Sequence, residues 1–191
     1  MLLGPDVHHA TIGIVGFGRI GREVAKRARG FDMQVLYYDV YQAPADEEAR
    51  LGARRVTLDE LLGLSDFVTL HVNLTPETHH MMNAQTFGKM KRSAILVNAS
   101  RGPVVDPDAL YDALKHGVIA AAALDVTEPE PMPGNHKLLT LPNCLVVPHI
   151  ASGSFATRGK MASIAAQNLL AGLRREPLPS FVNPEAYERR G

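Results

Sequence analysis

Short apolar runs alternate with amphipathic helical patterns along most of the chain. The runs are three to seven residues long and are not strictly alternating, so they predict strands buried on both faces of a sheet. They cover residues 11–15, 33–38, 66–72, 94–99, 118–124 and 145–147.

Helical patterns separate these runs. After the first run, Val24, Ala25 and Ala28 recur at helical spacing until Gly30 supplies a stop. Strands separated by helices predict a parallel, doubly wound α/β sheet of the Rossmann type.

Two further helices carry start signals. Thr57 and Glu60 have the spacing of a capping box. Asp106 can cap a helix whose first residue is Pro107. A long helix is predicted over residues 157–173, where apolar and small residues recur at helical spacing.

Prolines at 177, 179 and 184 exclude a regular helix near the end of the sequence. We therefore expect one domain over residues 4–176, followed by an extended tail over residues 177–191.

Composition excludes several classes of function. The chain has 191 residues, 46% of them hydrophobic, which is ordinary for a folded protein. Twenty basic residues balance twenty acidic ones, so we expect neither a nucleic-acid partner nor a membrane surface. The longest apolar run has seven residues, too short to span a bilayer, and the first residues lack a secretion signal, so we expect a cytoplasmic location.

Cysteine and histidine usage gives no metal signature. The one cysteine, Cys144, excludes an internal disulfide and is interpreted as a small buried residue. The paired histidines at 8–9 and 79–80 do not put two rings on one helical face, so we expect no metal. His71, within a predicted strand, is expected to be a packed residue.

A glycine-rich turn follows the first strand. Gly16 can make the tight turn, Gly18 leaves room for a pyrophosphate, and Gly21 lets the next helix lie close to the strand. The pattern alone is weak, but the strand before it and the helix after it favour a dinucleotide site over an empty turn.

An acidic residue stands where a dinucleotide's ribose would lie. Asp39 ends the second strand, 18 residues after Gly21, and can accept hydrogen bonds from the ribose hydroxyls. Its charge would repel a 2′-phosphate, so it favours NAD over NADP. Arg54 and Arg55 could weaken this preference, although we interpret them as solvated charges.

Three later strand ends carry ionisable residues. Arg101 follows the run at 94–99, acidic residues follow the run at 118–124, and His149 follows the run at 145–147. Arginine can hold a carboxylate in a bidentate geometry, and histidine can exchange a proton with a carbonyl oxygen. A carboxylate would stabilise the protonated imidazole. This set suits hydride transfer to a 2-oxo acid.

Together these segments resemble the D-isomer-specific 2-hydroxyacid dehydrogenases, in particular the glyoxylate/hydroxypyruvate reductases and phosphoglycerate dehydrogenases. Five motifs occur in the order typical of that family, and the similarity extends over residues 4–184. They are the glycine turn with Asp39 and the segments 71–78, 98–106, 125–131 and 148–152.

The resemblance implies roles for individual residues. Arg101 matches the substrate-binding arginine, His149 the acid/base, and Glu130 the carboxylate, with Glu128 as the alternative. It also implies an NAD site that is formed by Gly16, Gly18, Arg19, Ile20, Gly21, Asp39, Thr78, Ala99, Ser100, Arg101, Asp125, His149 and Ser152.

The sequence departs from the family pattern in two respects. Asn73 stands where relatives often have proline. The family's substrate domain, which precedes the segment starting at Gly4 and forms part of the substrate pocket, is largely missing. We therefore expect a chain that binds NAD but turns over 2-oxo acids poorly. The resemblance also implies a possible homodimer through this domain.

Three alternatives are weighed against the dehydrogenase. A non-catalytic, NAD(H)-sensing corepressor would keep the same arginine, glutamate and histidine, so these residues do not separate the two. Formate dehydrogenases of the superfamily have glutamine where Glu130 stands, which disfavours that activity. A short-chain dehydrogenase would use a Tyr-x-x-x-Lys pair, which we do not expect in this chain.

Overall fold

A computed structural model describes residues 4–183 and 185 of the chain. It divides into two compact units, Met1–His149 and Ile150–Gly191. The predicted domain boundary at residue 176 stays a prediction.

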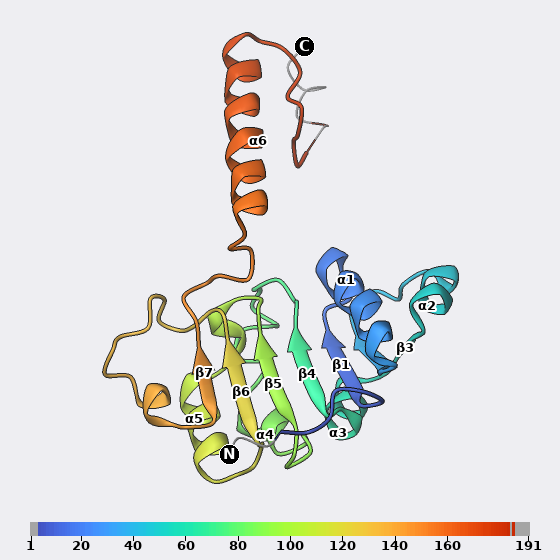
Figure 1. Ribbon diagram of the computed structural model, residues 1–191, viewed down its shortest axis with the longest axis vertical. Helices are drawn as coiled ribbons and strands as arrows, with labels where there is room; N and C mark the ends of the chain where they lie inside the picture. The colour runs from blue at the N-terminus through green and yellow to red at the C-terminus, as the bar shows by residue number, and fades with distance from the viewer. Residues whose placement is uncertain (1–3, 184, 186–191) are drawn as a thin grey trace. The chain divides into compact units, whose positions relative to one another are not determined.

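Seven parallel strands form a sheet in the first unit, in the order β3-β2-β1-β4-β5-β6-β7 (Figure 1). The chain reverses its direction across the sheet between β1 and β4, which is where doubly wound folds bind ligands. The strands are β1 Thr11–Val15, β2 Gln34–Tyr38, β3 Ala53–Arg55, β4 Phe67–Leu70, β5 Ile95–Asn98, β6 Ala121–Leu124 and β7 Cys144–Val146. The predicted doubly wound parallel sheet is confirmed.

Helices and short 3-10 turns connect the strands. Thr57 and Glu60 form the predicted capping box, and the Asp106 side chain accepts hydrogen bonds from Asp108 N and Ala109 N. The helices are α1 Arg19–Ala28, α2 Ala45–Leu51, α3 Leu58–Leu64, α4 Ala84–Phe87, α5 Pro107–Lys115 and α6 Phe155–Leu173. The 3-10 turns are η1 Arg29–Phe31, η2 Gly102–Val104 and η3 Lys137–Thr140.

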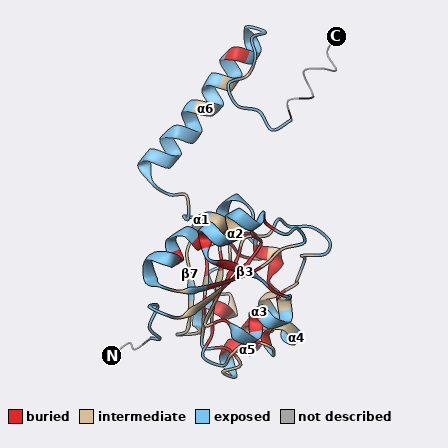
Figure 2. Ribbon diagram, turned by 90° about the vertical axis from the view of Figure 1, so that its right-hand side faces the viewer, coloured by how far each residue is buried: buried red, intermediate tan, exposed pale blue. Residues whose placement is uncertain are grey.

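Successive strand residues pack into two cores, one on each face of the sheet. Ile14 and Tyr37 belong to the core that includes residues of α1 and α2. Val15 and Leu36, their neighbours in sequence, belong to the larger core with residues of α3, α4 and α5. Buried residues therefore concentrate in the strands and on the inner helix faces (Figure 2). This packing fixes the edge where the strands end.

Three elements, α2, β3 and the four-residue helix α4, were missed from the sequence, because none of them has an apolar run. The helix α2 buries only Leu51 and has acidic residues throughout its first turn. The edge strand β3 consists of Ala53 followed by two exposed arginines. Its pairing with β2 is made by backbone hydrogen bonds, which a pattern of side chains cannot predict.

Several predicted boundaries are wrong by one to three residues, among them the end of the first helix and the start of β6. The helix α1 ends at Ala28, and the left-handed residue that closes the following turn is Asp32 rather than Gly30. The strand β6 begins at Ala121 rather than at residue 118. Ile119 is fully buried but precedes the strand. The apolar run is therefore longer than the strand that it predicts.

The second unit contains the predicted long helix, α6. Its side chains are mostly exposed, and Ala171 is the buried residue among those described in this helix (Figure 2). The Asn168 amide donates to Ser180 O and accepts from Ser180 N at 3.0 Å, which ties the return segment to the helix. Residues 176–183 carry neither helix nor strand, and Glu185 is assigned as helical. Pro184 lies outside the described residues, and the extended tail over residues 177–191 stays a prediction.

Candidate active site

The carboxyl ends of the parallel strands lie at one edge of the sheet, and the predicted residues of the first unit follow these ends. Because parallel strands share one direction, loops after β1, β2, β5, β6 and β7 meet at this edge. The residues that these loops bring to the edge are Gly16, Asp39, Arg101, Glu130 and His149.

The three glycines of the turn after β1 have different surroundings. Gly16 has φ +95°, and a Cβ there would lie 2.6 Å from His71 C. A Cβ on Gly21 would lie 2.2 Å from Gly16 O, so the start of α1 packs directly on the turn. A Cβ on Gly18 would meet nothing within 4 Å. Close packing therefore excludes a side chain at positions 16 and 21, whereas Gly18 faces open space.

Gly18 is also the N-cap of α1, and within the described residues no side chain caps this helix end. Backbone N–H groups at a helix start attract anions, since the helix dipole adds to their partial charges. Arg19 and Ile20, the first two helical residues, are exposed beside it. Open space and unused donors fit a pyrophosphate.

Asp39 is held at the end of β2 by two backbone donors. Its Oδ2 accepts from Phe17 N at 2.7 Å, and its Oδ1 accepts from Tyr41 N at 3.0 Å. The first bond ties the carboxylate to the glycine turn. Arg55 is exposed and donates to Asp39 O at 2.9 Å, so it caps the backbone rather than the carboxylate.

A buried asparagine shapes the turn that carries Arg101. Asn98 Oδ1 accepts from Ser100 N at 3.0 Å and from Ser100 Oγ at 2.8 Å, while its Nδ2 donates to Arg101 O at 2.9 Å. Arg101 is exposed, and its Nη1 donates to Ser100 O at 2.7 Å. Asn98 had no predicted role, although an asparagine whose side chain bonds the backbone two residues ahead is a common turn device.

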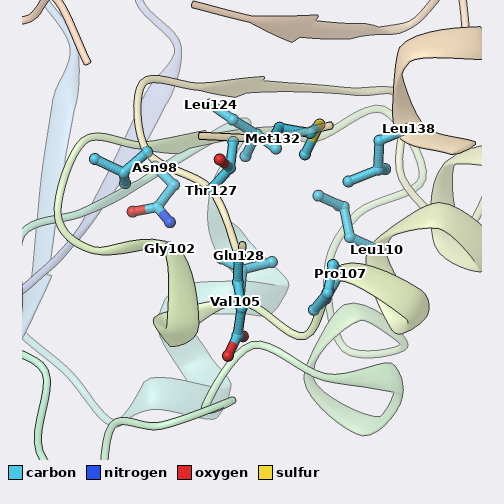
Figure 3. Close-up of a pocket in the computed structure, with 11 residues that line it drawn as sticks. Asn98, Gly102, Val105, Pro107, Leu110, Leu124, Thr127, Glu128, Met132 and Leu138 are labelled. Carbon is cyan, nitrogen blue, oxygen red and sulfur yellow. The ribbon is translucent and has the colours of Figure 1, made fainter. Parts of the chain in front are cut away.

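Gly102 presses this turn against the segment after β6. A Cβ on Gly102 would lie 1.8 Å from Thr127 O and 2.9 Å from Glu128 N. The adjacent pocket has only ≈ 10 Å³ of free volume, so it has no room for a substrate. In Figure 3, Asn98 lies on the opposite side of this pocket from Leu110 and Leu138. The small volume of this pocket reflects close packing between the turn after β5 and the segment after β6.

Glu130 and His149 form a direct pair. His149 Nδ1 lies 2.8 Å from Glu130 Oε1, and both side chains are partly exposed. The backbone holds the ring in place, because His149 N donates to Asp125 O at 2.9 Å and Asp125 N donates to Asn98 O at 2.9 Å. His149 has φ +53°, a left-handed conformation that non-glycine residues adopt at a cost of about 1–3 kcal/mol, often at functional sites.

Glu128, the alternative carboxylate, has a different partner. Its Oε2 lies 2.7 Å from His80 Nε2, in the loop that follows β4. This contact could not be predicted, because no pattern in the sequence links residues 48 positions apart. Glu128 and Glu130 thus contact two different histidines.

The remaining predicted residues are dispersed. Thr78 Oγ1 donates to Asn73 O at 2.6 Å and so closes the loop after β4 on itself. Ala99 directly follows β5. Ser152 belongs to the second unit.

The expectation that the chain lacks a Tyr-x-x-x-Lys pair is wrong. Tyr111 and Lys115 have this spacing on α5, and Lys115 Nζ lies 5.3 Å from the centre of the Tyr111 ring. A crossover helix runs from the carboxyl ends of the strands back toward their amino ends. Lys115, the last residue of α5, therefore lies toward the sheet edge opposite the glycine turn.

His71 directly follows β4 rather than lying within the strand, and its backbone packs against Gly16 of the glycine turn. Its Nε2 lies 2.9 Å from Thr69 Oγ1, and its Nδ1 is buried with no partner among the described residues. Burial lowers the pKa of His71 below its usual 6.5, because a charged ring would lose its hydration.

This burial predicts a pH effect on stability. The unfolded chain binds a proton at His71 at a higher pH than the folded chain does, so the stability contributed by neutral His71 is present above about pH 6.5 and falls below it. We expect His71→Gln to lose less unfolding free energy than the parent between about pH 7.5 and 5.5. Urea unfolding at both pH values measures this, and equal losses in the two proteins would contradict it.

Comparisons with known proteins identify the family of this chain. The model of the "D-isomer specific 2-hydroxyacid dehydrogenase, NAD binding domain" matches residues 1–151. The chain belongs to this family. Residues 1–151 correspond to the NAD-binding domain of this family.

The curated relatives are about twice as long. A glyoxylate reductase of Korarchaeum cryptofilum is 53% identical over 190 residues, which are 100% of this chain and 57% of the relative. A human glyoxylate reductase/hydroxypyruvate reductase is 49% identical over 179 residues, covering 94% of this chain and 55% of that protein. The chain thus spans somewhat more than half the length of the relatives that it matches.

Solved structures agree with the fold. A D-lactate dehydrogenase of Lactobacillus jensenii, solved with NAD⁺, has a TM-score of 0.85 at 32% identity, over 94% of this chain and 57% of that one. Within the described residues, no helix combines the length and the apolar character that crossing a membrane requires. Dimerisation and a cytoplasmic location stay predictions.

Proposed function

We propose that the protein catalyses NAD(H)-dependent interconversion of a small 2-oxo acid and its D-2-hydroxy acid. The observation that carries the proposal is the 2.8 Å contact between His149 Nδ1 and Glu130 Oε1, at the sheet edge that also bears Arg101. NAD(H), when bound, supplies or accepts the hydride.

The residues around the glycine turn fit this cofactor. Gly18 faces open space at the start of α1, which suits the pyrophosphate, and the Asp39 carboxylate is bonded to the same turn through Phe17 N. A carboxylate in this place suits ribose hydroxyls and disfavours a 2′-phosphate.

Three side chains would act on the acid. Arg101 holds its carboxylate and polarises the 2-oxo group, because a guanidinium forms paired charge-assisted hydrogen bonds. His149 exchanges a proton with the 2-oxygen through Nε2, the ring nitrogen that does not face Glu130. Glu130 orients the ring through Nδ1 and stabilises its protonated form.

Glyoxylate and hydroxypyruvate are the proposed substrates, since the relatives cited above are named for one or both of them. The test is NADH oxidation with each acid. It is measured on the chain and on a chimaera in which the chain replaces the 190 residues that it matches in the Korarchaeum relative. We expect turnover by the chimaera and little by the chain. A folded, NADH-binding chimaera that reduces neither acid would contradict the proposal.

The two glutamates are distinguished by paired variants of the chimaera. Glu130→Gln removes the charge that faces His149, and a charged hydrogen bond of about 1.5–3 kcal/mol corresponds to about 10–150-fold in kcat. Glu128→Gln removes a charge that faces His80 and should leave kcat within about 3-fold. Steady-state kinetics at saturating NADH measures both. The reverse order of effects would assign the positioning role to Glu128.

A further inference from the structure

His79, His80 and Glu128 form a cluster outside the roles assigned above. One ligand atom from each of them lies within 4.8 Å of the others. Glu128 Oε2 is 2.7 Å from His80 Nε2, and Glu128 Oε1 is 4.0 Å from His79 Nε2. We propose that these three side chains bind a divalent transition-metal ion, with Zn²⁺ as the best fit.

The ligand chemistry matches Zn²⁺. Two imidazole nitrogens and one carboxylate oxygen are a ligand set that zinc accepts, with a water at the fourth position. Bonds of about 2.0–2.2 Å in a tetrahedron separate neighbouring ligand atoms by about 3.3–3.6 Å. The two separations from Glu128 in the structure, 2.7 and 4.0 Å, fall on either side of this range. Side-chain shifts of less than 1 Å in each separation would thus admit the ion.

The backbone already directs the two imidazoles to one side. His80 has φ +49°, a left-handed conformation, and consecutive side chains consequently lie side by side. Their ring centres are 4.0 Å apart, with 28° between the ring planes. Adjacent histidines in an extended strand would point to opposite faces. Helical spacing, on which the expectation of no metal was based, does not apply to this loop.

Hydrogen bonds fix the histidine loop. His79 N donates to Thr75 O at 2.9 Å, and His80 N donates to Pro103 O at 2.8 Å. Asn83 Nδ2 donates to His80 O at 3.0 Å. A loop restrained in this way loses little conformational entropy when its side chains coordinate an ion.

The third ligand is restrained from the opposite side. Glu128 follows Thr127, whose carbonyl packs against Gly102, so the segment cannot approach that turn more closely. The side chains remain 33% exposed at Glu128, 34% at His80 and 51% at His79. An ion can therefore enter from solvent and keep a water ligand.

A bound ion would link two loops. The histidines lie in the loop after β4, and Glu128 lies two residues before Glu130 in the segment after β6. The metal site is independent of the proposed dehydrogenase activity, and its test therefore reads binding and stability only.

The decisive experiment is calorimetric titration of the chain with ZnCl₂, after removal of metals with a chelator. We expect one ion per chain. The affinity should fall at least about 10-fold in His79→Asn, His80→Asn and Glu128→Gln, because losing even an indirect metal contact costs about that much. Ni²⁺ should bind and Mg²⁺ should not, since Mg²⁺ prefers oxygen ligands.

The second histidine cluster provides a matched control. His8, His9 and Asp32 also lie within 4.8 Å of one another, but all three are exposed. The double variant His8→Asn, His9→Asn should bind Zn²⁺ as the parent does. If instead this variant abolishes binding, or the three cluster variants leave it unchanged, the proposal is overturned. Absence of binding up to about 1 mM Zn²⁺ would overturn it as well.

Thermal unfolding separates loss of the ion from loss of folding. Zn²⁺ should raise the Tm of the parent, because a ligand that binds only the folded state stabilises it. The Tm of the cluster variants should not respond. His80→Asn loses a hydrogen bond to Glu128. His79→Asn loses a 4.0 Å contact with Glu128 and the stacking on the His80 ring but no hydrogen bond to Glu128, so it tests the site if the other variant unfolds.

Discussion

In the chimaera, His149→Ala is expected to lower kcat for glyoxylate reduction by about 10²–10⁴-fold, the usual contribution of a general acid. The ring that would deliver a proton to the 2-oxygen is then absent, and Glu130 Oε1 loses its partner at 2.8 Å. NADH affinity should change little, because the glycine turn and Asp39 lie on other loops. Steady-state kinetics and NADH titration of the same sample measure the two effects.

His8→Ala is the matched control for this variant. His8 is an exposed histidine in the segment before β1, and its ring bonds to Phe31 O at 3.1 Å. It should leave kcat unaltered. A kcat in His149→Ala within about 3-fold of the parent would exclude His149 as the acid.

Gly102→Ala is expected to destabilise the chain by about 1–3 kcal/mol or more, as insertion of a methyl group into a filled core does. The new Cβ would lie 1.8 Å from Thr127 O and 2.2 Å from Thr127 C, and both atoms belong to the backbone. No rotamer change relieves such a contact. The turn that carries Arg101 and the segment that carries Glu130 would have to separate.

Gly134→Ala provides the comparison, because a Cβ there meets nothing within 4 Å and the residue is exposed. It should leave stability unchanged or raise it by up to about 1 kcal/mol. Urea unfolding measures both variants. Equal stabilities would show that the two loops are not packed as described.

The sequence was sufficient for the order of the main strands, because each buried run and each amphipathic helix has its own periodicity. It could not reveal α2 and β3, whose few apolar residues give no period. It also misplaced the start of β6, since Ile119 is buried without belonging to the strand.

For the site, the glycine turn, Asp39, Arg101 and His149 could be proposed because each follows a predicted strand. The contacts between these loops could not be predicted from the sequence. Glu128 and Glu130 are two residues apart in the same acidic, proline-rich segment, and only the fold shows that one faces His80 and the other His149. The roles of Asn98 and Gly102 likewise depend on distances between loops that are remote in sequence.

The central claim is that the glycine turn and Asp39 form an NAD site. Calorimetric titration of the chain with NADH and NADPH tests it most directly, beside Asp39→Asn and Gly18→Ala. Gly18→Ala should weaken NADH binding without loss of stability, since its Cβ meets nothing within 4 Å of the protein. We predict one NADH per chain, weaker binding of NADPH, and a smaller difference between them in Asp39→Asn. No binding of NADH, or tighter binding of NADPH by the parent, would contradict the account.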